Sequence, residues 1–196
     1  MDPLAFRLKY ISKPREREAV QIAAEKANWQ ARTAPRKQRA ANGNYVGQGL
    51  AYAFRSGTIV AIVAEVEVNP STGKIWARKY TCAHDCGIVI NPAELTRVLE
   101  GGILQAASRS LFEEVQFDQK NVRSVDWETY PIAEIQDAPE QIDVVLINHT
   151  DQAPGGAGEA VCRPVAGALA NALFDATGVR LRRAPLTAAR VKAALG

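Results

Sequence analysis

Two β-branched segments separated by a short turn constrain the fold more than any other feature of this sequence. The segment TIVAIVAEVEVN at 58–69 alternates and is rich in valine and isoleucine, and KIWARKYTCAHD at 74–85 alternates again. Between them, PSTG at 70–73 has the composition of a turn. We therefore expect an antiparallel hairpin, and a chain of 196 residues is long enough to bury a core around it without disulfides or metal.

Helical and extended patterns surround this hairpin in mixed order. Apolar residues recur at helical spacing over 15–29, 93–115 and 160–177, and the last of these segments is followed by Gly178, a fitting residue after a helix end. The segment QIDVVLINH at 141–149 predicts a further strand. Strands and helices that alternate in this way indicate an α+β fold.

Residues 30–49 carry basic residues, a proline and glycines, with almost nothing apolar, and we expect a connection there. The sequence thus predicts a helical lead and basic linker over 1–40 and an α+β domain over 41–196. The basic stretch around Arg32 and Arg36 has no interleaved aromatic residues for base stacking, so a solvated linker is favoured over a nucleic-acid site.

Composition excludes several further classes of protein. The net charge of +3 is too small to indicate a nucleic-acid partner, and no apolar run approaches the roughly 20 residues of a membrane-spanning helix. The first residues lack the pattern of a signal peptide, and three cysteines do not make a full disulfide framework. We take the cytoplasm as the default compartment.

The pentapeptide CAHDC at 82–86 is the one candidate metal motif. Cys82, His84 and Cys86 alternate on one face of the expected strand, and Asp85 faces the other way. A zinc site normally needs four ligands, and the chain offers no second pair of cysteine or histidine residues. Buried small residues are therefore the favoured interpretation, and we expect no metal ligands among these side chains.

Two glycine-containing features stay unexplained by these patterns: EGGILQ at 100–105 and GGAGE at 155–159. Glycine inside a helix costs about 1 kcal/mol relative to alanine, so something bulky should approach the first segment closely. In the second, small residues precede a single acid, Glu159, at the expected start of a helix. An acid in the first helical turn after a flexible loop would need no functional reason. Taken together, however, the two features are typical of a cofactor wall.

The ordered motifs of the chain resemble one family. The chain is similar to the carboxy-terminal part of the molybdenum-binding large subunit of the xanthine dehydrogenase and aldehyde oxidase family, in its isoquinoline 1-oxidoreductase branch. The matching segments are DPLAFRLKYI (2–11), GTIVAIVAEVEVNPSTGKI (57–75), CAHDCGIVINP (82–92), EGGILQAASRSLFEEVQFD (100–118), WETYPI (127–132) and GGAGEAVCRPVAGALANALFDATGVRLRRAPL (155–186).

The resemblance implies a fold and residue roles. The fold would be that of the carboxy-terminal molybdopterin-binding lobe of molybdenum hydroxylases. Glu159 would face the molybdenum centre as the general base, with its pKa raised by a closed apolar pocket. Gln105 would hydrogen-bond the pterin. The small residues expected to leave room for the cofactor are Gly155, Gly156, Ala157 and Gly158.

The resemblance also implies an activity, a cofactor and partners. The enzyme would hydroxylate an aldehyde or an N-heteroaromatic carbon with water, using molybdenum on molybdopterin in its cytosine dinucleotide form. Its partners would be the remaining large-subunit lobe and a 2Fe–2S subunit. Family large subunits are several times longer, so we expect this chain alone to form half a pocket without turnover. The alternative is a non-catalytic remnant or assembly module that binds no cofactor and associates with itself.

Overall fold

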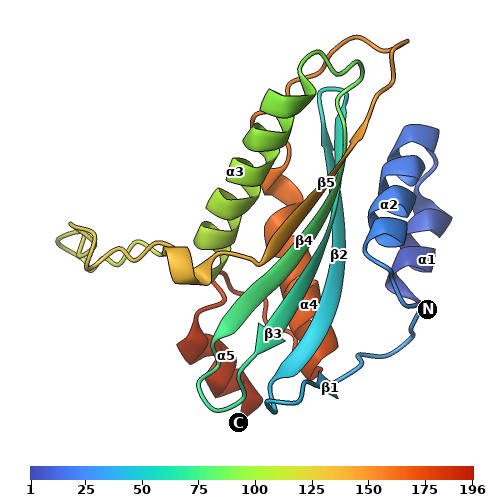
Figure 1. Ribbon diagram of the computed structural model, residues 1–196. Helices are drawn as coiled ribbons and strands as arrows, with labels where there is room; N and C mark the ends of the chain where they lie inside the picture. The colour runs from blue at the N-terminus through green and yellow to red at the C-terminus, as the bar shows by residue number, and fades with distance from the viewer.

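A five-stranded sheet runs through the protein and carries helices on both faces (Figure 1). The computed structural model describes residues 1–196. The strands follow chain order across the sheet: β1 (Gln38–Arg39), β2 (Tyr45–Arg55), β3 (Thr58–Val68), β4 (Ile75–Asp85) and β5 (Gln141–Ile147). The first four strands pair antiparallel, and β5 lies parallel to β4. This mixed arrangement confirms the α+β fold class.

The predicted hairpin is confirmed as β3 and β4, with Val68 opposite Ile75 beside the turn. Strand β3 has no solvent-exposed face, because helices cover both faces of the sheet. Alternate residues of β3 therefore point into two separate cores, one on each face of the sheet. Val60, Ile62 and Ala64 contribute to the larger core, and Ile59, Ala61 and Val63 to the smaller one.

The helices divide between the two faces. The larger core lies under α3 (Pro92–Leu111) and α4 (Cys162–Thr177), and the smaller one under α2 (Pro14–Lys26), with α1 (Pro3–Tyr10) beside it. Pro14 does not interrupt a helix but opens α2, where its missing N–H is not needed. A final short helix, α5 (Ala188–Leu195), was not predicted from the sequence. None of these helices combines the length and apolar character that crossing a membrane requires.

The expectation of a connection over 30–49 is wrong for its last residues, because β2 begins at Tyr45. The reason lies in Gly47 and Gly49, which suggest a loop by composition but serve close packing. A Cβ atom at Gly49 would lie 2.1 Å from the carbonyl oxygen of Ala168, and one at Gly47 would lie 2.4 Å from that of Ala172. The two glycines let α4 rest directly on the backbone of β2.

The basic residues of this segment are not free in solvent. The buried carboxylate of Asp175 in α4 accepts hydrogen bonds from Arg32 Nε at 2.6 Å and Arg36 Nε at 2.8 Å. It also accepts one from the backbone N–H of Gln48 at 2.9 Å. The segment is thus tied to α4 and β2 by one carboxylate. A domain boundary at residue 40 stays a prediction.

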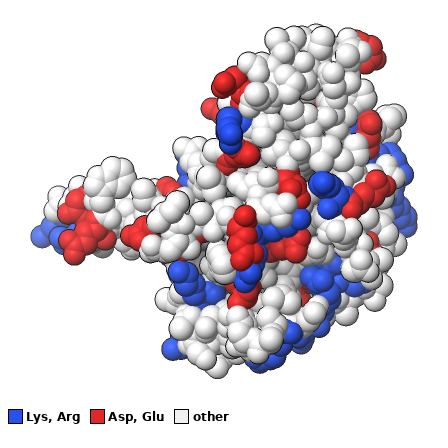
Figure 2. Space-filling model, in the orientation of Figure 1, with Lys and Arg blue, Asp and Glu red and all other residues white.

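An arm of residues 113–134 leaves the body after α3 and returns through a short 3-10 turn, Ile135–Asp137, to β5 (Figure 1). The predicted helix over 93–115 ends earlier, at Leu111. Large apolar side chains such as Phe117 and Trp127 are exposed on this arm. Figure 2 shows acidic side chains grouped on the projecting arm, with a smaller basic patch. The outer part of the arm therefore presents apolar and acidic side chains to solvent.

Candidate functional site

One end of the sheet gathers segments that are far apart in the sequence. Strands β2, β4 and β5 all finish there, because β4 and β5 are parallel and β2 runs in the same direction two strands away. The tight turn at 56–57, the segment after β4 and the glycine-rich loop before α4 therefore meet at this end (Figure 1).

Glu159 lies on this glycine-rich loop, in the turn just before α4 begins at Cys162. Its carboxylate accepts a hydrogen bond from Arg55 Nη1 at 2.8 Å. The two side chains are 81% and 51% exposed, respectively, so this ion pair contributes at most about 1 kcal/mol. The chain alone does not provide the closed apolar pocket expected around this acid. Instead, Glu159 borders an open cavity of about 230 Å³ that Arg55 and Gly156 also line.

The glycines beside Glu159 serve two different purposes. No atom lies within 4 Å of the Cβ position of Gly156 or Gly158, so both leave open space next to the acid. At Gly155, in contrast, a Cβ atom would lie 2.5 Å from Thr58 Oγ1. Gly155 is therefore needed for packing inside the chain, whereas the space beside the other two is free for another body. Ala157 is half-buried between them.

The close approach expected at the glycine pair in α3 comes from this chain itself. A Cβ atom at Gly102 would lie 2.5 Å from Val161 Cγ1, so this glycine makes room for the start of α4. Gly101 faces open space. Helix packing explains Gly102, and a cofactor is not required to account for it.

Gln105 is exposed on α3 and lines a separate cavity of about 370 Å³. This cavity lies between α3, Tyr80 of β4 and residues 132–139 where the arm returns. The Tyr80 hydroxyl is buried without a hydrogen-bond partner, and burial raises the pKa of this phenol above its usual value. The structure therefore does not place Gln105 and Glu159 in one cavity.

The CAHDC segment comprises the last four residues of β4 and Cys86 directly after it, and the interpretation as buried residues is confirmed. Burial raises the pKa of Cys82 to about 12. It also lowers the pKa of His84 to about 4, although the neighbouring Asp85 carboxylate opposes this shift. At neutral pH both groups are therefore uncharged. As expected, Asp85 points to the opposite face, towards α2.

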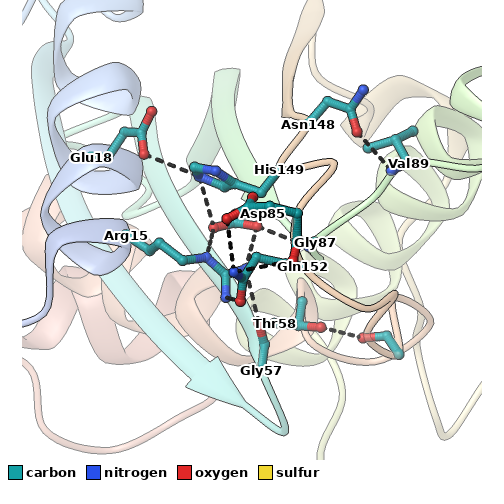
Figure 3. A network of polar contacts seen from close by, with 12 residues as sticks. Arg15, Glu18, Gly57, Thr58, Asp85, Gly87, Val89, Asn148, His149 and Gln152 are labelled. Carbon is teal, nitrogen blue, oxygen red and sulfur yellow. Dashed lines mark hydrogen bonds and ion pairs between the residues drawn. The ribbon is translucent and has the colours of Figure 1, made fainter.

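Asp85 is the centre of a polar network that the sequence patterns did not reveal (Figure 3). Its fully buried carboxylate accepts two hydrogen bonds from Arg15 of α2, at 2.8 Å from Nε and 2.6 Å from Nη2. His149 Nε2 lies 3.6 Å from the same carboxylate and 3.1 Å from Glu18 Oε2. The sequence signal for this network was an acidic residue at the end of an apolar strand. Its partner could not be identified, because Arg15 lies 70 residues away in the chain.

Comparison with known proteins gives one consistent result. The model of the family described as "Molybdopterin cofactor-binding domain" matches residues 5–139. A nicotinate dehydrogenase polypeptide of Pseudomonas putida is 38% identical over 204 aligned positions, which cover 100% of this chain and 17% of that protein. The beta polypeptide of isoquinoline 1-oxidoreductase from Brevundimonas diminuta is 34% identical over 94% of this chain and 23% of that protein.

Solved structures agree with these sequence matches. The aldehyde oxidoreductase from Desulfovibrio gigas superposes with a TM-score of 0.63 at 27% identity, over 70% of this chain and 15% of that one. Quinoline 2-oxidoreductase from Pseudomonas putida 86 gives a TM-score of 0.65 at 25% identity, over 70% of this chain and 18% of that one. The chain thus spans 17% to 23% of the length of the two curated relatives.

Proposed function

The chain belongs to the molybdopterin cofactor-binding family of molybdenum hydroxylase subunits, and we propose that it supplies the general base and part of the pterin pocket to such an enzyme. The reaction is the hydroxylation, with water, of an aldehyde or an N-heteroaromatic carbon. The observation that carries this proposal is the accessible carboxylate of Glu159 beside the open backbone of Gly156 and Gly158.

Glu159 is suited to accept a proton in this reaction. Its only ion-pair partner is Arg55, and because both side chains are largely exposed, the carboxylate can leave that partner at little cost. General-base assistance of this kind contributes about 10²–10⁴ in rate. The lack of side chains at Gly156 and Gly158 lets a bulky group approach the carboxylate without steric conflict.

Gln105 supports the same proposal from α3, where its exposed amide can both donate and accept hydrogen bonds to a pterin ring. When bound, molybdenum on the cytosine dinucleotide form of molybdopterin supplies the redox chemistry. A 2Fe–2S subunit would be the electron acceptor in the assembled complex. The chain's residues fit this cofactor as two separate contact regions, because Gln105 and Glu159 line different cavities and the Glu159 cavity is open to solvent.

Further protein must close the site. The side chain of Glu159 is 81% exposed, and a general base works best where water is excluded from the reacting groups. Because the chain spans about a fifth of its curated relatives, the remaining lobe of the large subunit is the natural cover. We therefore expect cofactor binding and turnover only in the assembled complex.

The test is Glu159→Gln in the molybdenum-loaded complex. This change keeps the size of the side chain and removes its basicity, so kcat should fall by about 10²–10⁴-fold while molybdenum content and assembly stay unchanged. Glu140→Gln is the matched control, because Glu140 is also exposed and pairs with an arginine, Arg78, at 2.6 Å, outside both segments proposed to face the cofactor. Normal turnover of Glu159→Gln would refute the assignment. Absence of molybdenum from the native complex would favour the non-catalytic assembly module.

A further inference from the structure

The loop that carries Glu159, residues 148–159, lies alongside a neighbouring turn, residues 86–88. Three backbone hydrogen bonds join the two: His149 N to Gly87 O at 3.3 Å, Ile88 N to Gln152 O at 3.1 Å, and Gly155 N to Cys86 O at 2.7 Å. Further along, the Thr58 hydroxyl donates to Gly156 O at 2.9 Å. The position of the turn therefore determines the position of the loop.

Asp85 holds the turn in place. The backbone N–H of Gly87 donates to Asp85 Oδ1 at 2.9 Å (Figure 3). Gly87 has a φ of +79°, and a Cβ atom there would lie 2.3 Å from the carbonyl oxygen of Ala153. A glycine is therefore required for the turn and the loop to lie in contact. The carboxylate of Asp85 has no exposure to solvent, so its geometry depends on its protein partners.

Arg15 links the Asp85 carboxylate to two further segments. Besides its two bonds to Asp85, its Nη1 atom lies 3.5 Å from Gln152 Oε1 on the loop. Its Nη2 atom donates to the carbonyl oxygen of Gly57 at 3.4 Å, in the turn next to Arg55. One guanidinium group thus contacts both segments that carry the Arg55–Glu159 ion pair.

We propose that the Asp85–Arg15 pair positions the 148–159 loop, and through it the carboxylate of Glu159, for catalysis. The proposal rests on the proposed function of Glu159. Arg15 and Asp85 are positioning residues, since neither touches the open cavity beside Glu159. A two-pronged arginine–carboxylate bond combines strength with geometric specificity. A misplacement of about 1 Å of a reacting group can cost about 10²-fold in rate, so such a bond has a direct kinetic consequence.

Arg15→Gln is the first test, because it removes the charge from a side chain that is 28% exposed. Asp85→Asn would leave a guanidinium without its buried counter-charge and could unfold the chain. In Arg15→Gln we expect amide hydrogen exchange at residues 149–156 to accelerate roughly 10- to 100-fold, as loss of a charged hydrogen bond predicts. Arg15→Lys keeps the charge and should restore part of the protection.

Arg190→Gln is the matched control. Arg190 pairs with Glu114 at 2.7 Å and its side chain is 21% exposed, so it resembles Arg15 in burial. It joins α5 to the start of the arm, at the end of the sheet opposite the loop (Figure 1). This variant should leave exchange at residues 149–156 unchanged. Unchanged exchange in Arg15→Gln, or equal acceleration in both variants, would overturn the proposal.

The molybdenum-loaded complex provides the second readout. Arg15→Gln should lower kcat by about 10- to 100-fold with KM within about twofold, and Arg15→Lys should recover part of kcat. A change in KM alone would contradict a positioning role. If Glu159→Gln is inactive but Arg15→Gln has normal kcat, only the positioning proposal fails. If Glu159→Gln keeps normal turnover, the proposed function fails first, whatever the exchange data show.

Discussion

Gly49→Ala tests the contact that places α4, and with it the loop before α4, against the sheet. An added Cβ atom would lie 2.1 Å from the Ala168 carbonyl oxygen and 2.1 Å from the Ala172 backbone nitrogen. Favourable contacts between heavy atoms begin near 3.5 Å. Both opposing atoms belong to the helix backbone, so no side-chain rotation can relieve the conflict. Strand and helix must move apart by more than an ångström.

The size of the effect follows from this geometry. Overpacking a core usually costs about 1–3 kcal/mol, and a conflict with backbone belongs at the upper end of that range. In a domain of this size, 1 kcal/mol corresponds to a change in Tm of about 2–4 °C. Gly49→Ala should therefore lower Tm by about 6–12 °C, because a large part of the contact between β2 and α4 is lost.

Thermal unfolding followed by circular dichroism measures this shift. Gly156→Ala serves as the control, because nothing lies within 4 Å of its Cβ position and its φ is not in the left-handed region. The control should change Tm by no more than about 2–4 °C, since such a substitution alters the free energy of unfolding by under about 1 kcal/mol. A Gly49→Ala protein that unfolds like the control would refute the argument from backbone contact.

Two further predictions concern buried charge and buried histidine. Asp175→Asn should lower the free energy of unfolding by about 3–5 kcal/mol in urea titrations, because Arg32, 10% exposed, loses its counter-charge; an unchanged midpoint would contradict this. His84 has a folded pKa of about 4, so the unfolded chain takes up the proton first as the pH falls below 6.5. The free energy of unfolding should therefore decrease by roughly 3 kcal/mol between pH 6.5 and pH 4 because of this group. In His84→Met the free energy of unfolding should depend less steeply on pH over this range. Parallel pH profiles of stability in the two proteins would disprove the prediction.

The sequence predicted the elements whose local pattern and tertiary environment agree. The hairpin of β3 and β4 is one example, since β-branched residues and a turn of suitable composition lie next to each other in the chain. The C-terminal end of α4 is another, because Gly178 has the left-handed conformation expected after a helix. In both cases the information lies within a few residues.

Elements were missed where a residue serves a distant contact. Gly47 and Gly49 suggested a loop because their role, close contact with α4, involves residues more than 100 positions away. The same reason limited how much of the candidate site could be predicted from the sequence. The glycine-rich segment and the family resemblance single out Glu159, whose role stays a prediction. Its partner Arg55 and the Asp85–Arg15 pair join segments separated by 104 and 70 positions. No local pattern encodes such pairs.

The burial of β3 on both faces has a consequence for how this protein can diverge in sequence. Substitutions in the sheet must satisfy two cores at once, so the scaffold has little freedom to change. Arg55 at the end of β2 and Ser56 in the turn after it are exposed and belong to neither core, so they have no such restriction. Sequence variation should therefore concentrate around this turn, where a new side chain alters the surroundings of Glu159 without repacking the interior.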